Sequence, residues 1–186
     1  MADFRKQHQT EEEKIFDEVV INIDRVARVV KGGRRFRFKA LVVVGDNKKR
    51  VGVGVSKGSD VQAAVTKATA VAKKNLHEIS IYKATIPHDA YAKVGGAKVL
   101  LKPAAPGTGI IAGGTVRSIL NVTGINDILS KSLGSSNKVN IAYATIEALT
   151  QIKPKNEWIT EEEESSKKKP AKSKAVKEVA AEAKEA

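Results

Sequence analysis

Hydrophobic and polar residues alternate along three consecutive segments in the first third of the chain. The segments are EVVINIDRVARVV (18–30), RRFRFKALVVVG (34–45) and RVGVGVS (50–56). Alternation with a period of two is typical of strands with one buried face. KGG and DNKK separate them, and glycine tolerates the positive φ that tight turns need. The pattern predicts a three-stranded antiparallel sheet.

A helix is predicted directly after the third strand, over residues 59–77. Ser59 and Gln62 have the spacing of a capping box. Apolar residues then recur at helical spacing. They are Val61, Val65, Ala68, Ala72 and Leu76. The helix is therefore expected to cover one face of the sheet.

The rest of the chain repeats the theme of a sheet covered by helices. Strands are expected in ISIYKATI, HDAYAKVGG and AKVLLKPA, and a further one in INDILSKSLGS. Helices are expected in TVRSILNVTG and NKVNIAYATIEALTQI, the second capped by Ser136 or Asn137. We expect an α+β fold of two domains, residues 14–78 and 79–158. A flexible arm (1–13) and a disordered, charged, low-complexity tail (159–186) flank them.

Positive charge is concentrated in the first predicted domain. The net charge is +12, but the tail from Ile159 has seven Lys and seven Glu and contributes nothing. Residues 22–57 hold eleven Lys or Arg against two Asp, including six of the eight arginines. Arginine is favoured where planar donors meet phosphate, so this clustering indicates a polyanionic partner.

Composition excludes several other classes of function. The chain has no cysteine, so disulfides and thiolate metal sites are not available to it. No apolar run reaches the length of a membrane span, and no signal peptide is evident, so we expect a soluble, intracellular protein without a membrane partner. His8, His77 and His88 are scattered without metal-ligand spacing. We expect no enzyme activity, metal or cofactor.

The alternation predicts which face of the sheet carries the charge. Arg35, Arg37 and Lys39 share one face of the second strand, and Phe36 and Phe38 share the other with Ala40. The helix is expected to lie on the phenylalanine face, so that both rings are core. If Val51, Val53 and Val55 also face the helix, Gly52 and Gly54 lie on the charged face and let a phosphate backbone approach.

Two other interpretations of these segments were weighed. The FRF spacing is faintly like the stacking aromatics of an RNA-recognition motif, but that arrangement would bury Arg35 and Arg37 at a cost of several kcal/mol per unpaired ion. The loop PGTGIIAGG, followed by Asp127, is superficially like a dinucleotide fingerprint. It lacks the parallel βαβ setting, and no G-K-[ST] follows for a phosphate loop. Close approach of its backbone to RNA or protein is the other use of Gly113, Gly114 and Thr115.

Two long motifs resemble one protein family. They are VVKGGRRFRFKALVVVGDNKKRVGVGVSKGSDVQAAVTKA and GTGIIAGGTVRSILNVTGINDILSKSLGSSN. Over residues 14–155 the chain is similar to ribosomal protein five of the small subunit, of bacterial type. The resemblance implies an N-terminal domain like a double-stranded-RNA-binding domain and a C-terminal α+β domain of the family's own type.

The resemblance also implies sites and partners. The hairpin loop from Val30 to Arg34 is expected to contact small-subunit rRNA. The glycine loop is expected to contact ribosomal protein four at an interface tied to translational accuracy, and the C-terminal domain to face ribosomal protein eight. Arg25, Arg28 and Arg50 are expected near the channel by which mRNA enters. The expected RNA-binding residues are Arg25, Arg28, Lys31, Gly32, Gly33, Arg34, Arg35, Arg37, Lys39, Arg50, Gly52, Gly54 and Lys57. The expected protein-interface residues are Gly107, Gly109, Gly113, Gly114 and Arg117.

The sequence therefore favours a non-enzymatic structural constituent of the small ribosomal subunit in the cytoplasm. It would bind rRNA and support decoding accuracy and mRNA entrance. A free-standing double-stranded-RNA-binding regulator is the alternative, which leaves the GTGIIAGG segment without a purpose.

Overall fold

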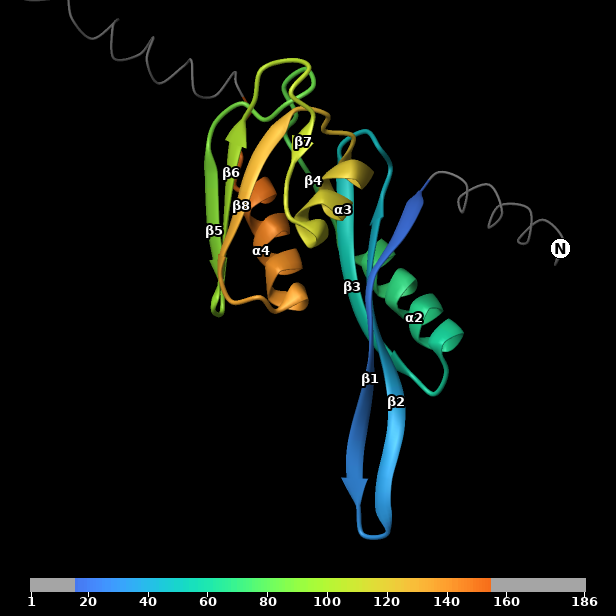
Figure 1. The fold of residues 1–186 in the computed structure, drawn as a ribbon. Helices are drawn as coiled ribbons and strands as arrows, with labels where there is room; N and C mark the ends of the chain where they lie inside the picture. The colour runs from blue at the N-terminus through green and yellow to red at the C-terminus, as the bar shows by residue number, and fades with distance from the viewer. Residues whose placement is uncertain (1–15, 155–186) are drawn as a thin grey trace, which may run out of the picture. The chain divides into compact units, whose positions relative to one another are not determined.

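The three predicted N-terminal strands are present in the computed structural model of the chain, which describes residues 16–154 (Figure 1). β1 (Asp17–Val30), β2 (Gly33–Gly45) and β3 (Arg50–Gly58) pair antiparallel, and β4 (Leu76–Glu78) adds a short fourth strand beside β3. The expected N-terminal arm (1–13) and the charged tail (159–186) lie outside the described residues.

The β1–β2 hairpin extends well past the rest of its sheet. Its ladder continues to the pair Val30 and Gly33, whereas β3 stops at Gly58, opposite Phe38. At roughly 3.4 Å per residue, the hairpin projects about 17 Å beyond Phe38. Lys31 and Gly32 form the turn, and Gly33 after them has a φ of +139°. Figure 1 shows this projection at the lower end of the sheet. We call residues 25–37 the hairpin arm.

Helix α2 (Val61–Lys74) packs on one face of this sheet with alanines rather than large side chains. Ala64, Ala68 and Ala72 are fully buried and cluster with Ala40, Val42 and Val44 of β2. Asp60 is the N-cap, and its side chain accepts no hydrogen bond from the N–H groups of the helix start, so the expected capping box at Ser59 was wrong by one position. The predicted helix and its covering role are confirmed.

The glycines of β3 lie beneath α2, and their expected place on the charged face was wrong. A Cβ on Gly54 would come within 2.0 Å of the Ala68 carbonyl oxygen, and one on Gly52 within 2.3 Å of the Ala72 carbonyl oxygen. Val51 and Val53 point the other way, into the larger core. The glycines therefore let the helix approach the strand, and they are not available to RNA.

The second half of the chain forms its own sheet, in the order β5-β6-β8-β7. β5 (Ala90–Val94) and β6 (Ala97–Pro103) form a hairpin, β8 (Ile128–Gly134) pairs antiparallel with β6, and β7 (Ile110–Ile111) pairs parallel with β8. The strand expected over 79–86 was wrong. That segment holds an isolated bridge between Tyr82 and Thr85 and a turn in which Lys83 has a φ of +56°.

Two helices lie between the sheets. α3 (Gly114–Thr123) contacts β1, β2 and β3, and α4 (Lys138–Thr150) contacts β5 and β6 as well as β3. Asn137 caps α4, with its Oδ1 accepting a bond from the Val139 N–H at 3.1 Å, as predicted. Both helices were predicted from the sequence, in TVRSILNVTG and NKVNIAYATIEALTQI.

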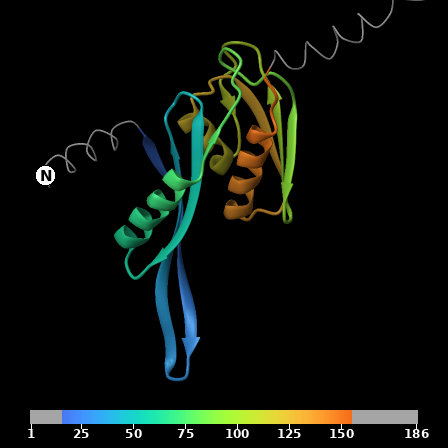
Figure 2. The same cartoon turned by 180° about the vertical axis from the view of Figure 1, so that it is seen from behind.

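One continuous core joins the two halves. Leu41, Val43, Val51 and Val53 of the first sheet belong to the same buried cluster as Ile119 and the other core residues of the second half. The first sheet is thus covered on both faces, by α2 on one side and by α3 and α4 on the other (Figure 2). The described residues up to Ile152 form one compact unit, and the division into domains at residue 78 stays a prediction.

The close approach of α2 to β3 yields a stability prediction. Gly54→Ala should lower the free energy of unfolding by about 2 kcal/mol or more. The new methyl group would overlap the backbone of α2, which can move away only if the whole helix shifts. Gly32→Ala is the control, since a Cβ there meets nothing within 4 Å and the position lies in the exposed turn. Urea unfolding of both variants measures the difference, and equal stability for the two would contradict the packing role.

Candidate nucleic-acid and protein interfaces

The hairpin arm carries exposed cations on both of its faces. All six, namely Arg25, Arg28, Lys31, Arg34, Arg35 and Arg37, are exposed. Residues 25–37 hold no acidic residue. At the base of the arm Lys39 is half-buried and its Nζ lies 2.7 Å from Asp24 Oδ2. The structure therefore brings six of the nine expected RNA-binding cations together on one projecting element.

Some of these cations face each other across the ladder. Arg28 is directly opposite Arg35, so two guanidinium groups share one cross-strand site. Like charges at such a site destabilise a hairpin. Arg37 lies opposite Val26, and its own face continues into the buried Leu41 and Val43. A polyanion lying along this face would relieve the repulsion.

Phe36 differs from its expected place, whereas Phe38 agrees with it. Phe38 is partly buried and packs against the alanine cluster under α2. Phe36 is 49% exposed, because it lies two residues further out on β2, past the end of β3. The guanidinium carbon of Arg25 lies 3.8 Å from the centroid of the Phe36 ring. The expectation that both rings are core was wrong for Phe36.

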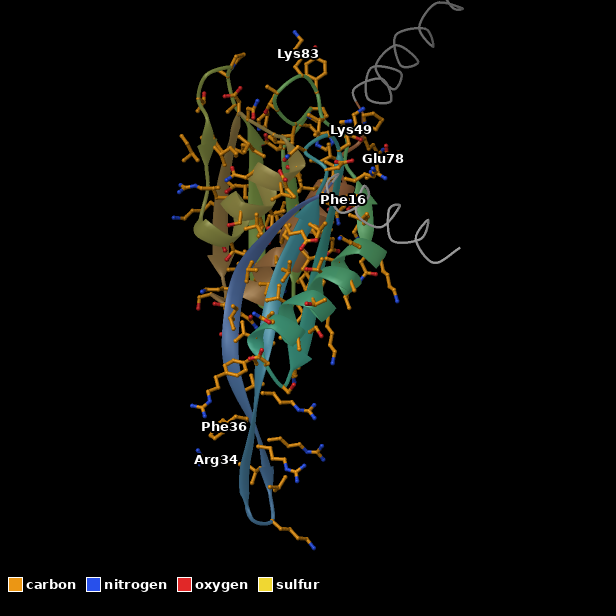
Figure 3. All side chains as sticks on the ribbon, turned by 90° about the vertical axis from the view of Figure 1, so that its right-hand side faces the viewer. Phe16, Arg34, Phe36, Lys49, Glu78 and Lys83 are labelled. Carbon is orange, nitrogen blue, oxygen red and sulfur yellow. The ribbon has the colours of Figure 1, made fainter. Side chains whose placement is uncertain are left out.

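Of the other expected RNA-binding residues, Lys57 lies near the arm and Arg50 does not. Lys57 is exposed and lies directly opposite Lys39 in the β2–β3 ladder, at the base of the arm. Arg50 begins β3 at the other end of the sheet. In Figure 3 its neighbour Lys49 lies at that end, far from Arg34 and Phe36 on the arm. Gly52 and Gly54 are buried under α2, as described above.

Arg50 takes part in the turn that joins β2 to β3. Its Nε donates to Asp46 Oδ2 at 2.8 Å, while Asp46 Oδ1 accepts the backbone N–H groups of Lys48, Lys49 and Arg50 at 2.9–3.0 Å. Burial alone would raise the pKa of Asp46. The bonds from the Arg50 side chain and from the three backbone N–H groups outweigh it and hold the pKa far below its usual range. This rigid turn leaves Lys48 and Lys49 exposed.

A second candidate surface is the glycine loop between β6 and α3. Gly107 and Gly109 have φ values of +87° and +75°, and their N–H groups both donate to Asp127 Oδ1, at 3.0 and 2.9 Å. Asp127 is only 7% exposed. In the sequence, Asp127 was considered only as part of a poor match to a dinucleotide-binding motif. The spacing of residues along the chain does not reveal that its carboxylate holds this loop through hydrogen bonds.

Most of the expected interface residues around the loop are glycines, so few side chains project from this surface. A Cβ on Gly107, Gly109, Gly113 or Gly114 would meet nothing within 4 Å. Gly113 is the N-cap of α3, and Arg117 is exposed on the first turns of that helix. Loop and helix start thus leave room for a neighbouring backbone to come close.

Metal-holding clusters and membrane-spanning helices were both sought in the part of the chain that the structure describes. Within residues 16–154, no cluster of three or more His, Asp or Glu side chains is placed to hold a metal ion. In that same range, none of the helices is both long enough and apolar enough to cross a membrane.

Comparison with known proteins identifies the family. Residues 16–80 match the family model described as ribosomal protein S5, N-terminal domain, and residues 92–161 match ribosomal protein S5, C-terminal domain. The chain belongs to the ribosomal protein S5 family. Two similar curated proteins are both named small ribosomal subunit protein uS5 and come from Dehalococcoides mccartyi, strains 195 and CBDB1. They are 53% identical over 152 and 148 residues, covering 82% and 80% of this chain and 88% and 86% of theirs.

Membership of the S5 family confirms the resemblance inferred from the two motifs. The expected α+β fold, with an antiparallel N-terminal sheet and helix, is also confirmed. The individual RNA and protein contacts assigned to the remaining residues stay predictions. Both family models span the segments that carry them, the hairpin arm in one and the glycine loop in the other.

The Asp127 bonds yield a prediction for the S5 glycine loop. Asp127→Ala removes the acceptor of both glycine N–H groups, so their hydrogen exchange should accelerate at least tenfold, the equivalent of about 1.4 kcal/mol. Asp127→Asn keeps an oxygen at the position that both donors share, so exchange should stay near the wild-type rate. Amide exchange followed by NMR at Gly107 and Gly109 measures both variants. Unchanged exchange in the alanine variant would show that other contacts hold the loop.

Proposed function

We propose that this S5-family protein is a non-enzymatic structural constituent of the small ribosomal subunit that binds rRNA through its hairpin arm. One observation carries the proposal: six exposed cations lie on an arm that projects beyond the packed fold and that holds no acidic residue between Arg25 and Arg37. The names of the similar curated proteins, small ribosomal subunit protein uS5, support the assignment to that subunit.

The shape of the arm suits contact with the phosphate backbone. A two-stranded ribbon about 17 Å long can follow several successive phosphates, and cations on both faces can reach RNA on either side. Arginine provides planar forks of donors for phosphate oxygens. Such contacts fix position rather than read sequence, which is the task of a protein that holds rRNA in place.

The finer partners follow from the family resemblance and from surfaces of this chain. The open glycine loop with Arg117 is proposed to contact ribosomal protein four, and the C-terminal domain ribosomal protein eight. The outer face of the second sheet supports protein contact, because Tyr91, Leu129 and Leu133 are exposed there. Arg25 and Arg28 on the arm, with Arg50 at the far end of the sheet, are proposed to lie near the mRNA entrance. Support for decoding accuracy and a cytoplasmic location belong to the same proposal, as does the division into domains at residue 78.

Sedimentation of tagged protein from cell lysate tests the role directly. The full-length chain should appear in the small-subunit fractions and should remain there after moderate washing with salt. A free-standing regulator of double-stranded RNA would instead sediment near the top of the gradient. Absence from the small-subunit fractions would overturn the proposal.

The arm yields a quantitative prediction for RNA binding. Arg35→Ala and Arg37→Ala should each weaken binding to duplex RNA with little dependence on sequence. Each should also reduce the slope of log affinity against log salt by about one, because one fewer counterion is released per lost phosphate contact. Lys93→Ala is the control, since Lys93 is exposed on β5 of the second sheet. A slope that stays unchanged in the arginine variants would place these side chains away from RNA.

A further inference from the structure

The most unusual feature of the arm is an aromatic ring in solvent among cations. Phe36 is 49% exposed, and the Arg25 guanidinium lies over its ring at 3.8 Å from the centroid. The attraction between a guanidinium and an aromatic ring is weaker in solvent than in a desolvated site, so this pair alone is a weak reason to keep a phenylalanine outside the core. The arrangement suggests that the exposed ring serves a ligand.

The surroundings keep the ring uncovered. Its cross-strand partner is Ala27, whose methyl group covers little of the ring. β3 ends opposite Phe38, and the alanine cluster beneath α2 reaches no further out than Phe38. Neither α2 nor β3 covers the Phe36 ring, so the ring contributes little to the packing of the fold.

We propose that the Phe36–Arg25 pair is a stacking site for an unpaired nucleobase. This inference rests on the proposed rRNA role and adds a chemical class to it: a bulged, looped or flipped-out base rather than a paired one. Bases inside an A-form helix are already stacked on their neighbours, whereas unpaired bases stack readily on aromatic rings and on guanidinium planes. The ring and the guanidinium provide the flat surface, and the base covers it.

The charges nearby favour a nucleotide over an apolar protein segment. Arg34 lies two residues from Phe36 on β2, and its side chain alternates to the same face. Arg25 itself carries a charge beside the ring. A base bound on the ring would leave its own phosphates within reach of these cations, while an apolar protein segment would have to desolvate them without compensation.

Binding of the full-length protein to two RNA probes tests this site. One probe is a hairpin RNA with a single bulged 2-aminopurine, and the other is the same stem without the bulge. The variants are Phe36→Leu, which keeps apolar bulk but removes the ring, and Phe36→Trp, which keeps an aromatic plane. Tyr91→Leu is the matched control, because Tyr91 is 50% exposed on the second sheet. Thermal unfolding of each variant checks that the fold is retained.

We expect Phe36→Leu to weaken binding to the bulged probe roughly tenfold and binding to the paired stem less than twofold. Quenching of the 2-aminopurine fluorescence on binding should be lost in the leucine variant and kept in the tryptophan variant. The salt slope should stay the same in Phe36→Leu but fall by about one in Arg25→Gln, because only the second change removes a charge.

The outcomes separate the stacking site from the general role. Equal losses on both probes, or quenching that survives in Phe36→Leu, would overturn the stacking site. Wild-type protein that binds the paired stem with steep salt dependence, but shows no preference for the bulge, would overturn the site and leave the rRNA role standing. Wild-type protein that binds neither probe would overturn both.

Discussion

The close contact between β3 and α2 is the constraint on which the rest of the structure depends. Glycines at 52, 54 and 58 face alanines at 64, 68 and 72, and in each pair a Cβ on the strand would overlap helix backbone. On this face the three helix alanines pack against Ala40, Val42 and Val44 of β2, while other apolar side chains of the sheet point the other way. Val51, Val53, Leu41 and Val43 do so and form a core with α3 and α4. The sheet is therefore buried on both faces, and six of its exposed cations lie on the β1–β2 extension that neither layer covers.

Local patterns predicted most of the elements but misassigned the faces of β3. Alternation located β1, β2 and β3, and helical spacing located α2, since each of these signals is contained in a short window. Alternation in RVGVGVS divides valines from glycines without stating which set is nearer a helix. The choice depends on the second half of the chain, which offers the valines a larger apolar surface. A local pattern cannot contain that information.

The candidate sites show the same division between local and distant information. Clustered arginines on a predicted hairpin indicated the polyanion-binding surface, because sequence neighbours on a hairpin remain neighbours in space. The exposure of Phe36 depends on where β3 ends, at Gly58, which no pattern within β2 specifies. Likewise the bonds from Asp127 to Gly107 and Gly109 join residues 20 and 18 positions apart, through a loop whose positive φ values bring both N–H groups to one oxygen.

The packing that stabilises the fold and the proposed RNA-binding surface consequently occupy different parts of the molecule. The double-sided packing of the first sheet involves no residue of the arm beyond its base, so the arm can carry charge pairs that would destabilise a packed strand. The Arg28–Arg35 pair is such a case: the two like charges lie directly opposite each other across the ladder and repel, and a phosphate between or beside them would reduce the repulsion. Binding of rRNA phosphates along the proposed surface would offset this repulsion. It would therefore stabilise the arm without involving the packed core.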